Sequence, residues 1–478
     1  MSGSTESRFV RSAGAATFSS LWRVGVTFLV ELILRRLIPA ADWGLWQWAL
    51  AAFLVLSAAR DLGLIFHVVR VRPRPFGNLL AVELGWGSLL TVATFAAAPL
   101  IARFYEQADP NKVAVLKALS LFLLLEGLAA VPKVYFESEL AIGRTVLPEV
   151  ARNLTFSLLA IGLALAGQGV WSFVIAHLAA TAVYAGWLWL RAYKVMPLTW
   201  QRGRTLGLVV ESLPLASIWL LSVLIVQIDM LILGPLVPGD RIGAYGFAYK
   251  TAFLVSFILV PAMTRSLYPA LVAFRSNPRR ALEAYRLATV FVLAAEAPMA
   301  MFLFANAELS IRILGGSGWA ESPAFLRILC FAPLIEPLSR LGGEVLKTYR
   351  KDALWIAASL ATLASFAVGG FLLTRRFGPY GMAWANYLPL GVVLMGFGLR
   401  RLDSRVFDTL LKELVLVYAA PALPLLAVYF LTPDALILRF ALSIAALIAT
   451  LLFYWRRFGA SARAFLSDPV AATEAAEG

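Results

Sequence analysis

Cysteine and histidine are almost absent from this chain. Its 478 residues include one cysteine, Cys330, and two histidines, His67 and His177. A single cysteine excludes an internal disulfide and a cysteine-cluster metal site. Two histidines are too few to make a histidine-ligated metal centre a reasonable expectation. We therefore expect neither a bound metal nor a cofactor.

Charged residues and catalytic motifs are also scarce. Charged residues are 15% of the chain, against about 25% in soluble proteins, whereas 60% are hydrophobic and the mean hydropathy is +0.79. The sequence has no GxxxxGK phosphate loop, no HExxH and no GxSxG. These absences argue against direct ATP hydrolysis and against an enzyme.

Long apolar runs dominate what is there. A membrane-spanning helix needs about 20 mostly apolar residues. About fourteen segments satisfy this, so we predict an all-α, polytopic membrane protein. The predicted spans are 13–34, 43–66, 79–101, 113–131, 147–166, 170–190, 208–233, 244–268, 287–306, 325–346, 354–373, 380–399, 414–431 and 436–455.

The net charge of +14 comes from short basic clusters between these runs. Such clusters are typical of cytoplasmic loops, and they argue against a nucleic-acid partner. Every second loop is rich in Lys and Arg if the N-terminus is cytoplasmic. We therefore expect both termini on the cytoplasmic side of a bacterial inner membrane.

Two short patterns occur once in each half of the chain. LRRLIP at residues 34–39 is echoed by LGPLVP at 233–238, and GVWSFVIAH at 169–177 by GPYGMAWAN at 378–386. The two echoes keep the same order at nearly the same offset. They pair predicted helix 1 with 7 and helix 6 with 12. Because six is an even number, the two halves form a parallel repeat, which in transporters places a cleft between them.

This repeat defines the expected domains. They are an N-terminal six-helix bundle (1–200), a C-terminal six-helix bundle (201–405), helices 13–14 (406–460) and a disordered cytoplasmic tail (461–478).

Two regions of the chain resemble a known family. One is the first loop, residues 34–49, followed by DLGL at 61–64; the other is the junction QIDMLILG (227–234) with GAYGFAYK (243–250). These residues resemble the oligosaccharide and polysaccharide flippases of the multidrug/oligosaccharidyl-lipid/polysaccharide exporter superfamily, the type that exports lipopolysaccharide O-antigen. The resemblance implies a lipid-linked oligosaccharide as substrate. It also implies that helices 13–14 offer a groove for the lipid tail.

Ionisable residues within the predicted spans are costly and mark candidate sites. On helices 1, 2, 7 and 8 they fall into two groups. The candidates for a substrate cavity are Arg23, Arg60, Asp61, Lys250 and Arg265, and the candidates for ion coupling are Glu31, Glu211 and Asp229. Arginines suit a pyrophosphate, since each guanidinium offers several donors to its oxygens. The lipid II flippases of the same superfamily have a comparable cationic cavity.

We interpret the chain as a flippase that carries polyprenyl-pyrophosphate-linked oligosaccharide across the membrane by alternating access. It would serve O-antigen or exopolysaccharide assembly, with membrane lipids, H⁺ or Na⁺ and the polysaccharide polymerase and assembly machinery as partners. A drug or metabolite antiporter of the same superfamily stays open, although the arginines argue against it. A membrane polysaccharide polymerase or ligase is the alternative from another class; a scaffold is a weaker one.

Overall fold

The computed structural model describes residues 25–70, 74–105, 110–139, 141, 143–432 and 435–467. Throughout this part of the chain the structure is helical, with no strand. The all-α prediction is therefore confirmed. The chain divides into two compact units, Met1–Gly243 and Ala244–Gly478, and the division falls inside one helix, α9 (Gly239–Ala252).

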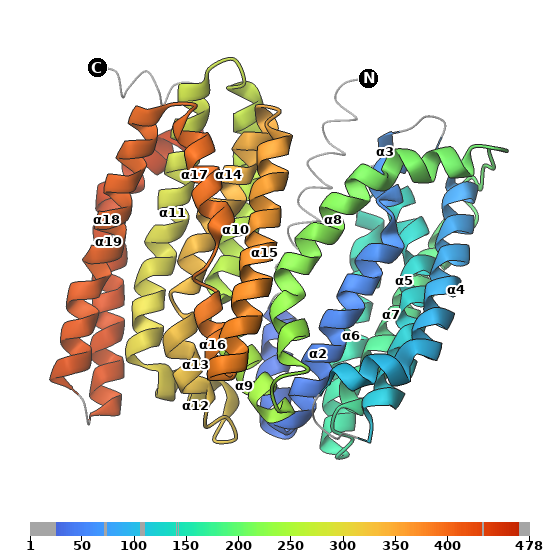
Figure 1. The fold of residues 1–478 in the computed structure, drawn as a ribbon, viewed down its shortest axis with the longest axis horizontal. Helices are drawn as coiled ribbons and strands as arrows, with labels where there is room; N and C mark the ends of the chain where they lie inside the picture. The colour runs from blue at the N-terminus through green and yellow to red at the C-terminus, as the bar shows by residue number, and fades with distance from the viewer. Residues whose placement is uncertain are drawn as a thin grey trace. The chain divides into compact units, whose positions relative to one another are not determined.

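The first unit begins with helical residues 25–37. It then contains α2 (Ala40–Asp61), α3 (Leu64–Arg70), α4 (Phe76–Ile101), a 3-10 turn (Ala102–Phe104), α5 (Lys112–Ser138), α6 (Gly143–Leu165), α7 (Trp171–Ala192) and α8 (Thr205–Leu233). Figure 1 shows these elements in blue to green, with α8 bent along its length. Pro214 lies inside α8 and removes a backbone donor, which accounts for a bend.

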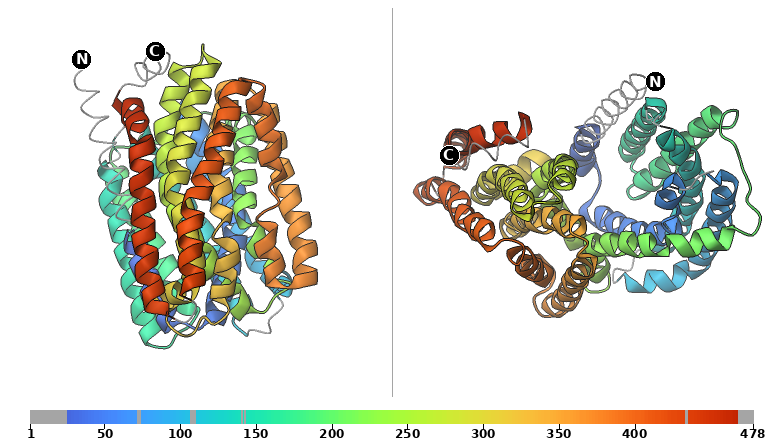
Figure 2. Two further views of the ribbon diagram at one scale, coloured as in Figure 1. Left: turned by 90° about the vertical axis from the view of Figure 1, so that its left-hand side faces the viewer. Right: turned by 90° about the horizontal axis from the view of Figure 1, so that it is seen from above.

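The second unit continues from α9. It contains α10 (Leu254–Ala273), α11 (Pro278–Ala305), α12 (Ala307–Gly315), α13 (Ser322–Leu329), a 3-10 turn (Ala332–Ile335), α14 (Glu336–Thr348), α15 (Asp352–Phe377), α16 (Pro379–Ala385), α17 (Leu390–Arg400), α18 (Ser404–Leu431) and α19 (Leu436–Ser467). Helices α18 and α19 lie side by side and both pack on α11 (Figure 2).

Eleven helices of the described residues are long and apolar enough to cross a membrane. They correspond to all predicted spans except three. Most of span 13–34 lies outside the described residues. Span 43–66 corresponds to α2, interrupted after Asp61, and span 325–346 is broken into α13, a 3-10 turn and α14. The count of fourteen stays a prediction.

Each unit has its own buried core. In the first unit it is built around Phe136, Leu188 and Val68, and in the second around Leu293, Leu341 and Val417. Outward-facing positions on helices are also apolar; Leu158 is 71% and Leu423 is 77% exposed. Apolar residues inside and outside are what helices packed in lipid require.

The loop between α7 and α8 is tied to the start of α4. The side-chain amide of Asn78, a fully buried residue, donates to the Gln201 carbonyl over 3.0 Å and accepts from the Gln201 backbone N–H over 2.8 Å. Gly77 donates its N–H to the Thr199 carbonyl over 3.0 Å. A Cβ at Gly77 would meet that same carbonyl at 2.8 Å. These bonds hold the loop that leads into α8 against α4 within the first unit.

The echoed sequences occupy matching places in the structure. Pro39 comes directly before α2 and Pro238 directly before α9. Gly169 and Gly378 both have positive φ, 51° and 62°, just before α7 and α16. Glycine adopts this left-handed backbone without the clash that a Cβ would cause. These correspondences support the repeat, which stays a prediction together with its domain boundaries.

The C-terminal tail differs from the expectation at its start. Helix α19 continues to Ser467, into the segment that we predicted to be disordered from residue 461. Ala, Arg and Leu in this stretch are good helix formers, so the apolar helix can extend beyond the span. Residues 468–478 lie outside the described part of the chain.

Candidate functional site: charged clusters of the two units

Arg60 and Asp61 are placed by a break in the chain. They form the last turn of α2, after which Leu62 and Gly63 take positive φ values of 50° and 68° and α3 begins. Gly63 is needed there because a Cβ would meet the Ser212 carbonyl of α8 at 2.7 Å. The break therefore holds the two charged residues at a fixed position between α2 and α3.

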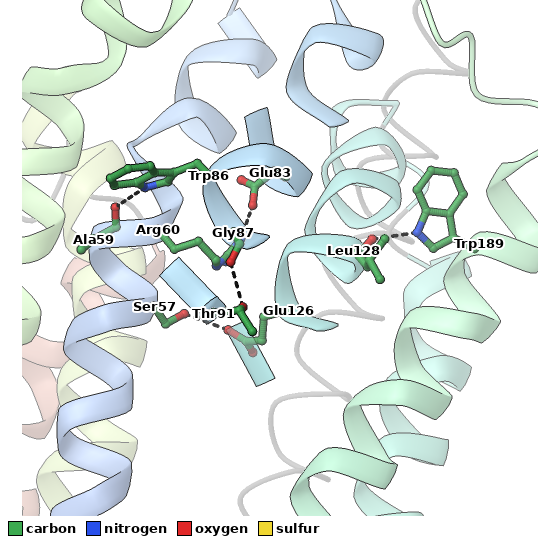
Figure 3. A network of polar contacts seen from close by, with 10 residues as sticks. All are labelled: Ser57, Ala59, Arg60, Glu83, Trp86, Gly87, Thr91, Glu126, Leu128 and Trp189. Carbon is green, nitrogen blue, oxygen red and sulfur yellow. Dashed lines mark hydrogen bonds and ion pairs between the residues drawn. The ribbon is translucent and has the colours of Figure 1, made fainter. Parts of the chain in front are cut away.

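Arg60 lies inside the bundle and forms an ion pair with Glu83 of α4 (Figure 3). The side chains are only 4% and 1% exposed, respectively. Gly87 of α4 and Gly127 of α5 leave room for the guanidinium, since a Cβ at Gly127 would meet its Nη1 at 3.2 Å. Taking a charge out of water is costly, and a partner of opposite sign offsets much of that cost. Arg60 is thus committed to Glu83 in this structure.

Glu126 of α5 adds a second acid beside this pair. It accepts a hydrogen bond from the Ser57 hydroxyl over 3.0 Å, and Arg152 of α6 lies 3.6 Å from its other oxygen. Figure 3 shows Ser57 and Glu126 next to Arg60 and Glu83. The cluster therefore joins α2, α4, α5 and α6 through alternating charges.

Asp61 is also buried, with 8% exposure. It accepts a hydrogen bond from the backbone N–H of Ile65, in the first turn of α3, while its Oδ1 atom has no hydrogen-bond partner among the described residues. This bond satisfies one of the free N–H groups at the start of a helix. Asp61 is thus held at the α2–α3 break, and its role in a substrate cavity stays a prediction.

The other cavity candidates lie elsewhere. Arg265 is exposed on α10, between Pro261 and Pro269. Lys250 is half-buried in the last turn of α9 and has interactions with other groups. Arg23 lies outside the described residues. Among the cavity candidates that the structure describes, only Arg60 and Asp61 lie together, in the first unit. Lys250 and Arg265 lie in the second unit, on different helices.

The three ion-coupling candidates have different surroundings. Glu31 pairs with Arg35 one turn later, over 2.9 Å. Glu211 is 57% exposed and lies 3.1 Å from His67 of α3. Asp229, near the other end of α8, is 2% exposed and is hydrogen-bonded. Pro214, at the bend of α8, lies between Glu211 and Asp229. Each acid therefore has its own partners, and the three form no common cluster.

The sequence also placed Glu296 and Glu336 within spans without giving either a role in the candidate site. In the second unit Glu336 forms an ion pair with Arg340 over 2.7 Å and accepts from Ser256 over 2.8 Å, whereas Glu296 is 2% exposed. Only the cost of a buried acid could have drawn attention to Glu296 from sequence. No group of three or more His, Cys, Asp or Glu within the described ranges could hold a metal ion.

The fold has counterparts among solved structures. It is similar to a lipid II flippase, MurJ, in an inward closed conformation, with a TM-score of 0.75 at 12% identity, over 92% of this chain and 98% of that one. It is also similar to an inward-facing multidrug resistance transporter of the MATE family in the MOP superfamily. There the TM-score is 0.67 at 14% identity, over 82% of this chain and 96% of that one. The chain therefore has the fold of these transporters.

A family profile described as "Polysaccharide biosynthesis protein" matches residues 33–324. The chain belongs to this family. It is also similar to the succinoglycan biosynthesis transport protein ExoT of Rhizobium meliloti (strain 1021), with 21% identity over 325 residues. That match covers 67% of this chain and 65% of the relative, slightly less than two thirds of the relative's length.

Proposed function

We propose that this protein is a flippase that translocates a polyprenyl-pyrophosphate-linked oligosaccharide for surface polysaccharide assembly. The observation that carries the proposal is the flippase fold over nearly the whole of a chain that belongs to a polysaccharide biosynthesis family. The similarity to the succinoglycan biosynthesis transport protein supports the same function.

Alternating access is the mechanism that this fold supports. The two units would open in turn to each side of the membrane, as rocking-type transporters do. The saccharide and pyrophosphate would cross in a cationic cavity while the polyprenyl tail stays in lipid. Among the candidate cations in the described part of the chain, Arg265 is the exposed one on a spanning helix, so its guanidinium is available to phosphate oxygens. Arg60 is less suited, because it is already paired.

The location follows from the same proposal. The protein would reside in a bacterial inner membrane with both termini in the cytoplasm, where basic loops are retained. A H⁺ or Na⁺ gradient would drive transport, since the sequence has no phosphate-binding loop. A polysaccharide polymerase would use the flipped units on the outer side.

The antiporter alternative rests on the likeness to the MATE transporter fold. Drug or metabolite antiporters do not need a cation for a phosphate group. Transport that is independent of Arg265 would therefore favour this alternative.

The test is the leaflet distribution of the lipid-linked oligosaccharide in a deletion strain complemented with variants. We expect the deletion to trap the unit on the cytoplasmic leaflet and to remove one surface polysaccharide. The wild-type chain and Arg375→Ala, an exposed arginine at the end of α15, should restore it. Arg265→Ala should accumulate in the membrane and fail. Units on the outer leaflet of the deletion strain would point instead to a polymerase or ligase.

A further inference from the structure

Among the described acids of the second unit, Glu296 is the one with both carboxylate oxygens buried and without a hydrogen-bond partner. It lies well inside α11 and is 2% exposed, and neither of its carboxylate oxygens has a hydrogen-bond partner among the described residues. An ionised carboxylate without a partner is very unfavourable in a medium of low dielectric constant. The group therefore needs a bound cation or a proton.

Its surroundings come from three helices packed against α11. Ser256 of α10, Glu336 of α14 and Tyr418 of α18 are the described groups that act on it electrostatically. Both oxygens of Glu336 are already satisfied: Oε1 accepts from Arg340 over 2.7 Å and Oε2 from Ser256 over 2.8 Å. The Glu336–Arg340 pair is neutral as a unit, so the charge of Glu296 is the one left uncompensated.

Exposure increases stepwise from this acid to the surface of the unit. The side chain of Glu296 is buried, that of Glu336 is 18% exposed and that of Arg340 is 52% exposed. Ser256, itself 1% exposed, donates to Glu336 and lies on α10, which packs against both α11 and α14, the helices of the two acids. A hydroxyl can donate one proton while it accepts another.

We propose that Glu296, Ser256 and Glu336 form a proton-binding site within the second unit, which couples the transport cycle to proton uptake and release. The Ser256 hydroxyl donates to Glu336 in this structure, so the transfer requires it to turn toward Glu296. A proton that arrives at Glu336 then passes to the Ser256 oxygen as the hydroxyl proton of Ser256 passes to Glu296. One O–H bond forms on Glu296 and one breaks on Glu336, so one positive charge moves inward and Ser256 is regenerated. The coupling role rests on the proposed transport function; the proton site itself does not.

A proton fits this site better than a metal cation. Ca²⁺ takes 6–8 oxygen ligands and Mg²⁺ takes an octahedral set of oxygens. The described groups at Glu296 offer two carboxylates and two hydroxyls, and one of the carboxylates is already bound by an arginine. A proton needs only one oxygen.

Infrared difference spectroscopy of the full-length protein in lipid vesicles tests the site without any transport substrate. We expect a carbonyl band of a protonated carboxyl group that disappears reversibly as pH is raised, and that Glu296→Gln lacks. The matched control is Glu344→Gln on α14, whose acid is 17% exposed and paired with Lys347 over 2.8 Å. The control should keep the band. An unchanged band in Glu296→Gln overturns the site, and a band that added NaCl removes at constant pH overturns the assignment to a proton.

Transport separates the two proposals. In the complemented strain, Glu296→Gln should lower export at least tenfold at normal protein levels, with Glu344→Gln near wild type. Normal export by a variant that lacks the band would overturn the coupling role while leaving the flippase intact. Failure of the wild-type chain to restore export would overturn the proposed function, yet the infrared test of the site would still stand.

Discussion

Trp46 packs against His177 in the first unit, with ring centroids 5.7 Å apart and the rings edge to face. Their counterparts are Tyr245, which follows Trp46 by the same 199 residues that separate the first echo, and Asn386, the last residue of the second echo. These two residues also touch each other in the second unit, where the Asn386 amide donates to the Tyr245 hydroxyl over 3.2 Å. Two echoes found separately along the chain thus meet in space at the same point of each unit.

These matching contacts support the predicted repeat. A chance match of short patterns would not place both members of each pair in contact. In both units the contact joins the helix after the first echo to the helix that begins with the second. The polar residue, His177 or Asn386, is a packing partner in each case.

His177 should tolerate the residue of its counterpart. We expect His177→Asn to accumulate and export normally, because an amide can pack against Trp46 as Asn386 does against Tyr245. His177→Ala removes ring contacts to Trp46 and to Phe122, whose centroid is 4.3 Å away. The loss should be about 1–3 kcal/mol. Thermal unfolding in detergent measures it. If His177→Asn is as unstable as His177→Ala, the packing role is wrong.

Gly44 of α2 lies against the start of α9, and Gly243 of α9 lies against the start of α2. A Cβ on Gly44 would meet the Gly239 carbonyl, and a Cβ on Gly243 would meet the Ala40 carbonyl. We expect Gly44→Ala and Gly243→Ala each to destabilise the protein by about 1–3 kcal/mol, since backbone must shift to admit the methyl group.

The control for these glycines is Gly186→Ala in α7, where a Cβ would meet nothing within 4 Å. That change should be neutral or stabilise by up to about 1 kcal/mol, because alanine favours a helix interior. Thermal unfolding in detergent compares all three. Equal stability of the three variants would show that the close approach does not exist.

Arg60 and Glu83 should each be destabilising when the other is removed, because they form a buried ion pair. Removing either partner of a buried pair leaves an uncompensated charge and costs about 3–5 kcal/mol. We expect Arg60→Met and Glu83→Gln each to reduce accumulation in the membrane, and the double variant to recover most of it. The amounts of folded protein, measured by fluorescence-detected gel filtration, report this. If Arg60→Met accumulates fully but cannot export, Arg60 acts on substrate as the sequence predicted.

Topology can be checked with reporter fusions. Fusions after Arg74, Arg204, Arg286 and Arg405 should be active as cytoplasmic reporters, and a fusion near Asp240 as an external one. The reason is the retention of basic loops on the cytoplasmic side. Alkaline phosphatase and green fluorescent protein measure the two sides. A reversed result at two of these positions would refute the orientation.

The helices could be predicted from sequence because apolar runs of spanning length are a strong signal. The breaks within the predicted spans were harder to predict. Nothing in the pattern of 325–346 shows that the chain forms α13, a 3-10 turn and α14, since Pro333 and Pro337 alone do not fix where a helix stops. The break after Asp61 depends on the contact of Gly63 with α8, which is distant in sequence.

Charge pairing could not be predicted either. Arg60 and Glu83 lie in two different predicted spans, 43–66 and 79–101, and their pairing depends on how α2 and α4 pack. Pairs within one helix were accessible: Arg340 follows Glu336 by one turn, and the structure shows them bonded over 2.7 Å. Spacing fixes contacts along a helix, whereas contacts between helices require the tertiary fold.

The burial of Cys330 has a practical consequence. Its thiol donates to the Arg327 carbonyl over 3.3 Å and the residue is 1% exposed, so a water-soluble maleimide has no access to it. Labelling of added cysteines therefore does not require Cys330 to be replaced. One cysteine added at an exposed position outside the spans of each unit, at Arg202 and Arg401 for example, would carry a pair of spin labels. The distance between the labels would then follow the motion of the two units through a transport cycle.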